Sequence, residues 1–182
     1  MSLDDGCHSD LMAAELASKY GVNTVFYVPV EWRSLAYSKG YEPLTYASLL
    51  DLASNFEIGA HTVTHRHLTS IPYLEAVVEI IDSKFMMESL TGEKINKFCP
   101  PRGYINDELT ESVLRHFDSQ RLTKGEGLVH IHPDSGANNN VYWTEAIGPK
   151  TTEIWGHSWE IDKFDLWDEL EEVLREHSYT EL

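Results

Sequence analysis

Apolar residues recur along this chain in two alternating patterns, short runs typical of strands and longer stretches with helical spacing. The run 24–30 is β-branched and aromatic, which predicts a strand. Asp10 to Tyr20 predicts a helix that ends at Gly21, because glycine commonly follows the last helical residue. The other predicted strands are 56–61, 97–99, 128–132, 141–147 and 153–157, and the other predicted helices are 45–55, 70–92, 106–116 and 164–174. Strands that alternate with helices favour a parallel α/β sheet, either closed or open.

The predicted helix 70–92 carries the longest apolar pattern. Ser70 is a suitable N-cap, Pro72 fits the first turn and Gly92 marks the end. Between them, five apolar residues recur at helical spacing: Leu74, Val77, Val78, Ile81 and Phe85.

The composition adds a strongly acidic charge to this globular pattern. Of 182 residues 42% are apolar, and neither a repeat nor a linker is visible, so residues 1–182 are expected to form a single domain. Lys and Arg total 14 against 30 Asp and Glu, a net charge of −16, which disfavours nucleic acid and anionic membranes as partners. This balance suits neutral or cationic substrates, although a well-hydrated acidic surface with no steering role is the simpler explanation.

Two cysteines and the hydropathy pattern exclude other classes of protein. Cys7 and Cys99 are too few for a disulfide framework, so both are expected to be buried free thiols. No apolar run approaches the about 20 residues that span a bilayer, and we expect no signal peptide in this chain. These features leave the compartment and the oligomeric state open.

Polar residues with catalytic chemistry follow several predicted strands. They are the pair Asp4-Asp5 before Gly6, the pair His61 and His65, and His157 within Trp155–Glu160. In parallel α/β folds the chemistry gathers at the carboxyl ends of the strands. The shared placement of these residues therefore matters more than any one of them.

Two histidines and one aspartate are the ligands of a common type of metal site. At a spacing of four, His61 and His65 would share one face of a helix and reach one cation. One carboxylate added to them leaves a coordination position open for water, which is typical of a catalytic zinc site. Adjacent residues of a strand point to opposite sides, so one carboxylate of Asp4-Asp5 can bind metal while the other turns elsewhere. Nine histidines produce such spacings by chance, and His67 is expected to lie on the surface.

Four motifs, in order, resemble those of the polysaccharide deacetylases (the NodB-homology domain, carbohydrate esterase family 4). The first motif of that family resembles Ser2-Leu3-Asp4-Asp5-Gly6, and the second, His-Ser/Thr-x-x-His, is matched by His61 to His65. The third, usually Arg-Pro-Pro-Tyr-Gly, stands here as Cys99-Pro100-Pro101-Arg102-Gly103. The last, a hydrophobic residue two before a histidine, is matched by Trp155-Gly156-His157.

This resemblance implies an α/β fold, a distorted (β/α)7 TIM-like barrel, that removes N-acetyl groups from a carbohydrate. It implies Asp4 as general base and His157 as general acid, with Asp5, His61 and His65 as ligands of a divalent metal, foremost zinc, with cobalt, nickel or another transition metal as alternatives. Only three residues precede Asp4, so we predict a truncated first strand whose neighbours are partly uncovered.

The chain departs from the family pattern around the base and the substrate pocket. Cys99 stands where the family has an arginine that orients the base, and Arg102 either takes over that contact or is a surface arginine. Trp155 replaces a leucine that lines the acetyl pocket. We name Arg102, Trp155 and Trp159 as candidate substrate contacts, with Trp143 a weaker one and Trp167 expected in the core.

The sequence leaves two points open: the carboxylate partner of His157, and the role of His130 and His132. Asp134 is a weak candidate for the carboxylate that supports His157, and no other is evident. His130 and His132 face one side of a predicted strand, where surface or loop packing is favoured over a second metal.

Two other functions compete with deacetylation of a sugar. The missing arginine and the early start fit a carbohydrate-binding or scaffold protein that kept the fold and lost catalysis. The same fold also supports hydrolysis of a small non-sugar linear amide.

Overall fold

Seven parallel strands form one curled sheet at the centre of the molecule. The computed structural model describes residues 1–126, 128–131 and 150–178; the predicted strand 141–147 and the candidates His132, Asp134 and Trp143 lie outside these ranges. The strand order is β5-β4-β3-β2-β1-β7-β6. The strands are β1 (Ser2–Asp4), β2 (Val25–Val28), β3 (Glu57–Ala60), β4 (Lys97–Phe98), β5 (Ser119–Gln120), β6 (Leu128–Ile131) and β7 (Glu153–Gly156).

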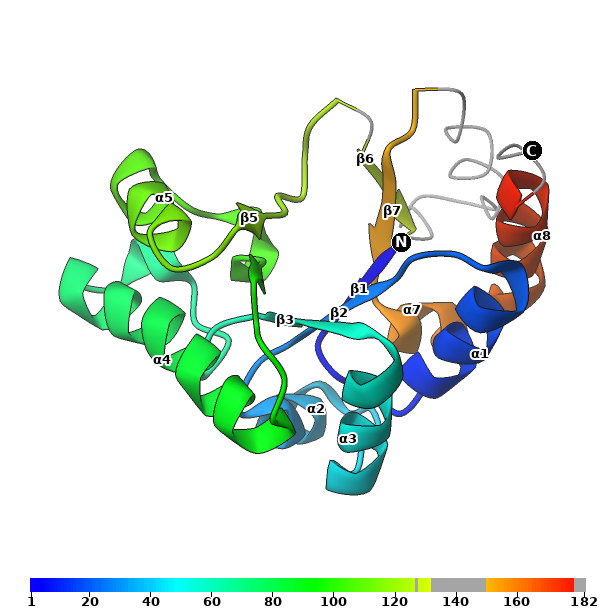
Figure 1. Cartoon of the computed structure of the whole chain (residues 1–182), viewed down its shortest axis with the longest axis horizontal. Helices are drawn as coiled ribbons and strands as arrows, with labels where there is room; N and C mark the ends of the chain where they lie inside the picture. Colours follow the sequence, from blue (N-terminus) through cyan, green and yellow to red (C-terminus); the bar gives the residue numbers. More distant parts are fainter. Residues whose placement is uncertain (127, 132–149, 179–182) are drawn as a thin grey trace.

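Helices cover the convex side of this sheet in an arc that runs from α5 to α8 (Figure 1). They are α1 (Asp10–Tyr20), α2 (Trp32–Lys39), α3 (Tyr46–Asn55), α4 (Tyr73–Thr91), α5 (Asp107–Leu114), α7 (Ser158–Lys163) and α8 (Trp167–Ser178), with the 3-10 turns η1 (Leu68–Ser70) and η2 (Pro101–Gly103). Among the described residues the two edge strands, β5 and β6, do not pair, so the sheet is an open (β/α)7 barrel. The predicted fold class is confirmed.

The first strand is short but not deficient. All three residues of β1 are buried, and β1 pairs in parallel with β2 on one side and β7 on the other. The expectation that its neighbours would be partly uncovered is wrong for β2, whose four residues are all buried. The physical reason is that every strand among the described residues is only two to four residues long, so three residues are enough to complete the pairing.

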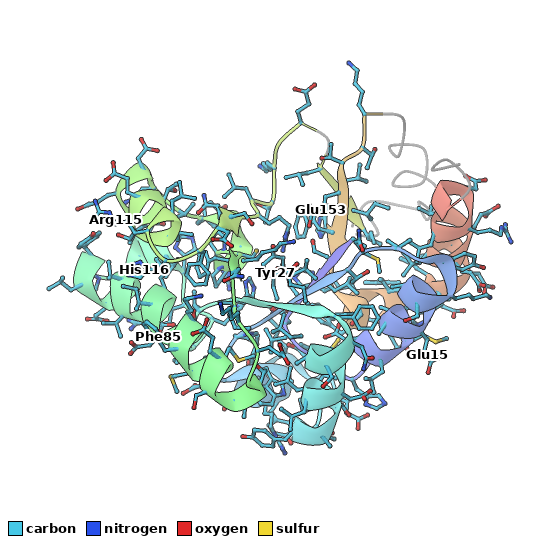
Figure 2. The ribbon with its side chains drawn as sticks, viewed as in Figure 1. Glu15, Tyr27, Phe85, Arg115, His116 and Glu153 are labelled. Carbon is cyan, nitrogen blue, oxygen red and sulfur yellow. The ribbon has the colours of Figure 1, made fainter. Side chains whose placement is uncertain are left out.

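The core lies between the sheet and the helices. Leu3 and Phe26 of the central strands are fully buried and belong to the main apolar cluster, to which α1, α4 and α8 contribute. Tyr27 points to the other side, into the middle of the arc of helices (Figure 2), where it packs with Val25 and Cys99. The concave side of the sheet is therefore partly polar, and the strand ends that open on it carry the candidate site.

Capping residues explain most helix boundaries. Thr45 accepts a hydrogen bond from the Ser48 N–H at 3.0 Å, and Asn106 accepts one from the Leu109 N–H at 3.0 Å, so the predicted starts of α3 and α5 are confirmed. The N-cap predicted at Ser70 is wrong. Ser70 ends the turn η1, and α4 begins after Pro72, whose fixed φ of −54° suits that position.

The apolar stripe that revealed α4 lies on its outer side. Phe85, labelled in Figure 2, is 57% exposed, and Leu74 and Val78 are 74% and 53% exposed. The buried side is made by Ala76, Glu79, Ile80, Ser83 and Met87. The buried side is mixed because Glu79 serves the candidate site. Among the described residues, no helix combines the length and the apolar character needed to cross a membrane.

Candidate metal centre and active site

A sharp turn at the end of β1 separates the two adjacent carboxylates. Asp5 has a φ of 85° and Gly6 a φ of 68°, both left-handed. A Cβ at Gly6 would lie 2.8 Å from Val28 Cγ1 and 3.2 Å from Trp32 Cβ, so only glycine fits this close approach. A non-glycine residue such as Asp5 adopts this backbone at a cost, and such strain is concentrated at functional sites. The turn directs Asp4 and Asp5 to different partners.

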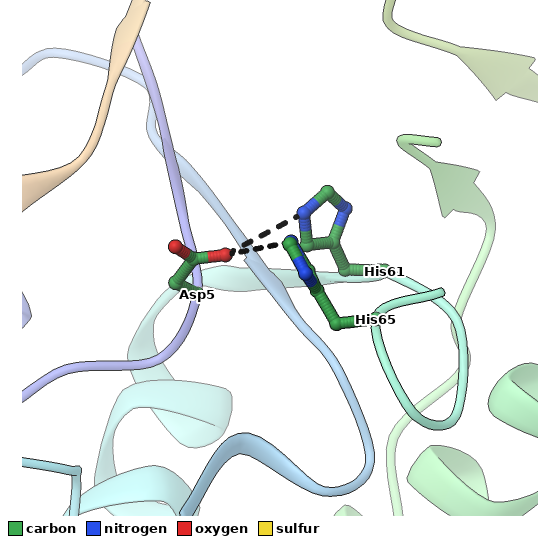
Figure 3. A group of neighbouring side chains, drawn as sticks. All are labelled: Asp5, His61 and His65. Atoms are coloured by element: carbon green, nitrogen blue, oxygen red, sulfur yellow. Dashed lines mark ion pairs between the residues drawn. The ribbon is translucent and has the colours of Figure 1, made fainter. Parts of the chain in front are cut away.

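Asp5 faces two histidines, His61 and His65, in the segment that follows β3. Its Oδ1 lies 3.1 Å from His65 Nε2 and 3.7 Å from His61 Nε2 (Figure 3). Among the described residues, no donor is aligned for a hydrogen bond to this buried oxygen. One carboxylate oxygen and two imidazole nitrogens around one point are the donors that zinc and similar divalent cations prefer. The three side chains therefore fit the predicted metal.

The segment His61–His65 is a loop and not the turn of helix that its spacing indicated. Thr62 has a φ of 69° and His65 a φ of 59°, which break any helical path. The Thr62 hydroxyl accepts a hydrogen bond from the His65 N–H at 3.0 Å, which closes the loop on itself. The two rings still meet, because the loop folds back at the end of β3.

Glu79 anchors this loop through hydrogen bonds. This role was not predicted from the sequence. Its Oε2 accepts hydrogen bonds from the N–H groups of Val63 at 2.9 Å and Thr64 at 2.8 Å, and its Oε1 accepts one from the Thr64 hydroxyl. Glu79 belongs to α4 and is only 6% exposed. A buried carboxylate with three donors ties the histidine loop to the longest helix.

The surroundings of His61 fix its tautomer. Its Nδ1 lies 2.7 Å from the Cys99 carbonyl oxygen, which can only accept, so Nδ1 carries the hydrogen and Nε2 presents a lone pair toward Asp5. Burial lowers the pKa of His61 to about 4, which keeps the ring neutral near pH 7. A neutral imidazole with a free Nε2 is the form that binds a metal.

The second oxygen of Asp5 has donors of its own. Lys39 Nζ, at the end of α2, donates to Oδ2 at 2.7 Å, and Trp159 Nε1 donates to it at 3.4 Å. Burial opposes ionisation of Asp5, but His65, His157 and Lys39 outweigh it and hold the pKa of this carboxyl well below its usual range. Asp5 is thus a carboxylate with one oxygen held and the other directed at the histidines.

Asp4 has a different partner, Arg121, which the sequence did not reveal. The buried guanidinium of Arg121 donates to Asp4 Oδ1 and, at 2.9 Å, to the Cys99 sulfur. The Cys99 thiol lies 3.9 Å from Asp4 Oδ2, and burial raises its pKa well above the usual value, so it stays a thiol. Burial also opposes the Asp4 charge, but Arg121 outweighs it and the pKa of Asp4 is lowered. Arg102, the residue weighed for this contact, is exposed on η2 and does not make it.

His157 is supported by a carboxylate three residues along the chain. Glu160 Oε2 lies 2.8 Å from His157 Nδ1, and His157 Nε2 lies 3.8 Å from Asp5 Oδ2. Burial lowers the pKa of His157, but Glu160 and the carboxylates of Asp5 and Asp4 outweigh it, so the net pKa is raised. Asp134 lies outside the described residues, and Glu160 fills the place considered for it.

A cavity of about 390 Å³ joins these side chains. Trp155 lines it, with its ring stacked on His130 at 3.8 Å and the Arg121 guanidinium 4.6 Å from its centroid. Trp159 lines it too, stacked on Tyr41 at 5.4 Å. His130 therefore packs on Trp155 inside the cavity, and it also lies near His157 and Glu160 in a second group of potential ligands, so the choice between packing and a second metal stays open. His67 packs on Tyr104, outside both groups.

The fold and these contacts define a class, the α/β barrels with a candidate metal centre at the carboxyl ends of their strands. A family model described as polysaccharide deacetylase matches residues 2–117, and the chain belongs to this family. The family expected from the four motifs is confirmed. A search of curated proteins found no match.

Solved structures share the fold. The peptidoglycan deacetylase PdaC from Bacillus subtilis is 22% identical with a TM-score of 0.72, covering 97% of this chain and 82% of that one. A family 4 carbohydrate esterase from Streptomyces lividans in complex with acetate is 14% identical with a TM-score of 0.71, covering 97% and 87%. A family 4 pseudoenzyme from Bacillus anthracis is 16% identical with a TM-score of 0.67, covering 94% and 59%.

Proposed function

We propose that this chain is a metal-dependent hydrolase that removes N-acetyl groups from a carbohydrate and acts as one catalytic domain over residues 1–182. The observation that carries the proposal is the buried Asp5 Oδ1, which faces the Nε2 atoms of His65 and His61 at 3.1 and 3.7 Å without an aligned donor among the described residues. The names of similar structures, a peptidoglycan deacetylase and a carbohydrate esterase bound to acetate, support the same chemistry.

Asp5, His61 and His65 would hold the cation, with zinc the best match to two nitrogens and one oxygen. When bound, a divalent cation polarises an acetyl carbonyl and makes water easier to deprotonate. The protein fixes the donors beforehand: Cys99 holds the tautomer of His61, Lys39 holds the second oxygen of Asp5 and Glu79 holds the loop.

Asp4 is the proposed general base. Arg121 keeps it ionised, because a guanidinium beside the carboxylate lowers its pKa. Asp4 lines the same cavity as the two histidines, so an attacking water there is within its reach. As the water oxygen bonds to the acetyl carbon, Asp4 takes one proton from it.

His157 is the proposed general acid. The C–N bond breaks only if the nitrogen receives a proton, since it would otherwise have to leave as a strongly basic amide anion, whereas the protonated nitrogen leaves as a neutral amine. Glu160 holds Nδ1 and raises the pKa of the ring, so Nε2 carries the proton that the amine takes. The products are acetate and a free amino sugar.

Three residues are the proposed substrate contacts. Trp155, Trp159 and Arg102 all line the cavity. Indole rings suit the apolar faces of a sugar. Trp155 is already covered by His130 and Arg121, so we assign it to the acetyl end of the cavity and Trp159 to the sugar.

The test is acetate release from N-acetylglucosamine oligomers together with metal analysis of the purified protein. We expect a bound divalent metal, activity that is lost with a chelator and restored by zinc, and a severe loss in Asp4→Asn. Absence of both metal and turnover would refute the proposal.

The same assay separates the alternatives. Sugar binding that ignores chelators, without turnover, would identify a binding protein. Arg121 weakens that reading, since it supplies the contact that was thought missing. Turnover of small formyl or ureido amides but not of acetylated sugars would identify the third function.

A further inference from the structure

A second group of potential ligands lines the same cavity as the candidate metal centre. It consists of His130, His157 and Glu160, each of which offers one donor atom, and these atoms lie within 4.8 Å of one another. We call these three residues the second cluster. Two imidazoles and one carboxylate are the same donor set as in the candidate metal centre, and this set suits zinc and similar divalent cations.

The sheet places the two imidazoles of the second cluster on one side. His130 of β6 is in register with Trp155 of β7, and these two strands are parallel. His157 lies two residues after Trp155 on extended backbone, with φ −125° and ψ 122°, so its side chain points to the same side as the indole. The His130 ring is stacked on Trp155 with 7° between the ring planes, and its centroid lies 6.1 Å from that of His157. The indole thus holds one imidazole near the other.

Glu160 adds the carboxylate from the first turn of α7. Its Oε2 lies 2.8 Å from His157 Nδ1, and a carboxylate can only accept, so Nδ1 carries the hydrogen between them. A divalent cation can take the place of this hydrogen, which leaves to solvent as a proton, because metal ligands bind in their deprotonated form. The candidate metal centre needs no such exchange at Asp5 Oδ1, which has no aligned donor among the described residues. The second cluster should therefore bind a cation more weakly.

We propose that the second cluster is a separate, weaker site for a divalent cation, and that a cation bound there stops catalysis. The inhibition rests on the proposed function, in which His157 is the general acid, whereas the binding does not. With a cation on Nδ1, the only hydrogen on the His157 ring is the one at Nε2, and its transfer would leave an imidazolate. The ring then has no proton to donate to the leaving amine. The stacking of His130 on Trp155 holds a ligand in place and is not packing alone.

The test counts zinc ions. Metal-free protein is titrated with zinc by calorimetry, and metal analysis after equilibrium dialysis gives a second measure. We expect two zinc ions per wild-type chain, the second with a Kd at least about 10-fold higher than the first, because disturbing a hydrogen bond beside a ligand costs about 10- to 100-fold in affinity. Zinc held loosely by the acidic surface is shared by the wild type and its variants, so it cancels in their comparison.

The His130→Phe variant assigns the second ion to the second cluster. Phenylalanine keeps a ring on Trp155 but has no nitrogen, so we expect one zinc ion with the Kd of the first wild-type site. Retention of this ion shows that the variant is folded. His67→Phe is the matched control, because His67 packs on Tyr104 outside both groups of ligands, and it should keep both ions.

Acetate release from an N-acetylglucosamine oligomer tests the inhibition. In the wild type the rate should fall by about 10²- to 10⁴-fold as the second ion binds, the range for loss of a general acid. The readout is the rate at excess zinc divided by the rate at one equivalent, taken within each protein. This ratio should stay near one in His130→Phe and fall in His67→Phe as in the wild type.

The outcomes separate this inference from the proposed function. One zinc ion per wild-type chain, or two in His130→Phe, would overturn the second site and leave the hydrolase intact. A second ion that binds at the second cluster without slowing acetate release would overturn the inhibition. If no oligomer is hydrolysed at any zinc concentration, the proposed function fails, and the zinc count in the wild type and in His130→Phe still decides the second site.

Discussion

Asp4 and Asp5 are adjacent and both buried, yet they meet opposite surroundings. Asp4 is held by the guanidinium of Arg121 beside the Cys99 thiol, whereas Asp5 faces two imidazoles with one oxygen and Lys39 with the other. One left-handed turn at Asp5-Gly6 creates this difference. The comparison shows that the environment, and not the residue type, sets the partners of each carboxylate: a guanidinium and a thiol for Asp4, and two imidazoles for Asp5.

The largest expected effect is the loss of zinc affinity when the Asp5 carboxylate is removed. We expect Asp5→Ala to lower zinc affinity by more than about 100-fold, because changes around a ligand already cost about 10- to 100-fold. Competition with a chelating dye measures it. Asp4→Ala is the matched control and should keep the affinity within a few-fold. Equal losses in both variants would show that the two carboxylates are not divided as proposed.

Substitution of Asp4 should lower turnover and leave the affinity for metal unchanged. In Asp4→Asn, acetate release should fall by about 10²- to 10⁴-fold, the range for loss of a general base, while zinc affinity is retained. Arg121→Gln should weaken turnover less, because it raises the pKa of Asp4 without removing it. Unchanged turnover in Asp4→Asn would contradict the assignment.

Glu79 tests whether the Asp5 side depends on its loop. Glu79→Gln keeps an acceptor but loses the charge that binds the Val63 and Thr64 N–H groups, so zinc affinity should fall by about 10-fold. Asp82→Asn, at an exposed carboxylate on the same helix that does not contact the histidine loop, is the control and should have no effect. A loss of stability without a loss of affinity would assign Glu79 to the fold alone.

A variant of Glu160 tests the proposed role of His157 as general acid. Its hydrogen bond raises the pKa of His157, so protonated His157 persists to higher pH. The alkaline limb of kcat/KM should therefore move to lower pH in Glu160→Gln. A pH profile at one equivalent of zinc measures this shift. A limb that stays in place would show that His157 is not the acid or that Glu160 does not support it.

Another buried carboxylate, Asp10, sharpens the comparison because no arginine or imidazole among the described residues pairs with it. It accepts hydrogen bonds from the Cys7 N–H at 3.1 Å and the Ser158 hydroxyl, and burial raises its pKa to about 7. The folded state thus holds the proton longer than the unfolded chain does. As pH rises from 3.8 to about 7, its contribution to the free energy of unfolding falls.

The Asp10→Asn variant removes this titration. Across that pH range, wild-type stability should fall relative to the variant by up to about 1.4 kcal/mol per pH unit. Urea unfolding at a series of pH values measures the difference. Parallel curves for the two proteins would contradict a raised pKa for Asp10.

The sequence predicted those parts of the site that lie in contiguous motifs. Asp5, His61 and His65 were placed together by resemblance and by their positions after strands, and the structure brings them within reach of one point. The helical interpretation of His61–His65 was wrong because positive φ at Thr62 and His65 leaves no periodic trace. Glu160 was within reach of inference, since it lies three residues after His157.

No sequence pattern identified three other residues around the candidate site, Arg121, Lys39 and Glu79. Arg121 follows β5, a polar strand of two residues that no pattern marks. Lys39 ends α2, whose only buried residues are Trp32 and Ala36, too few for a visible stripe. Glu79 sits on the inner side of α4, while the conspicuous apolar residues of that helix face outward. Contacts made across the fold between single polar residues need the structure.

The two buried cysteines can report how often the structure around them opens. Cys7 and Cys99 are 1% and 0% exposed and unpaired, one beneath the first turn and the other against Asp4. A thiol reagent can reach each sulfur only when the structure around it opens, so the rate of labelling reports the frequency of that opening. Without any substitution, the two labelling rates thus report separately how often the structure opens at the candidate metal centre and at the first helix.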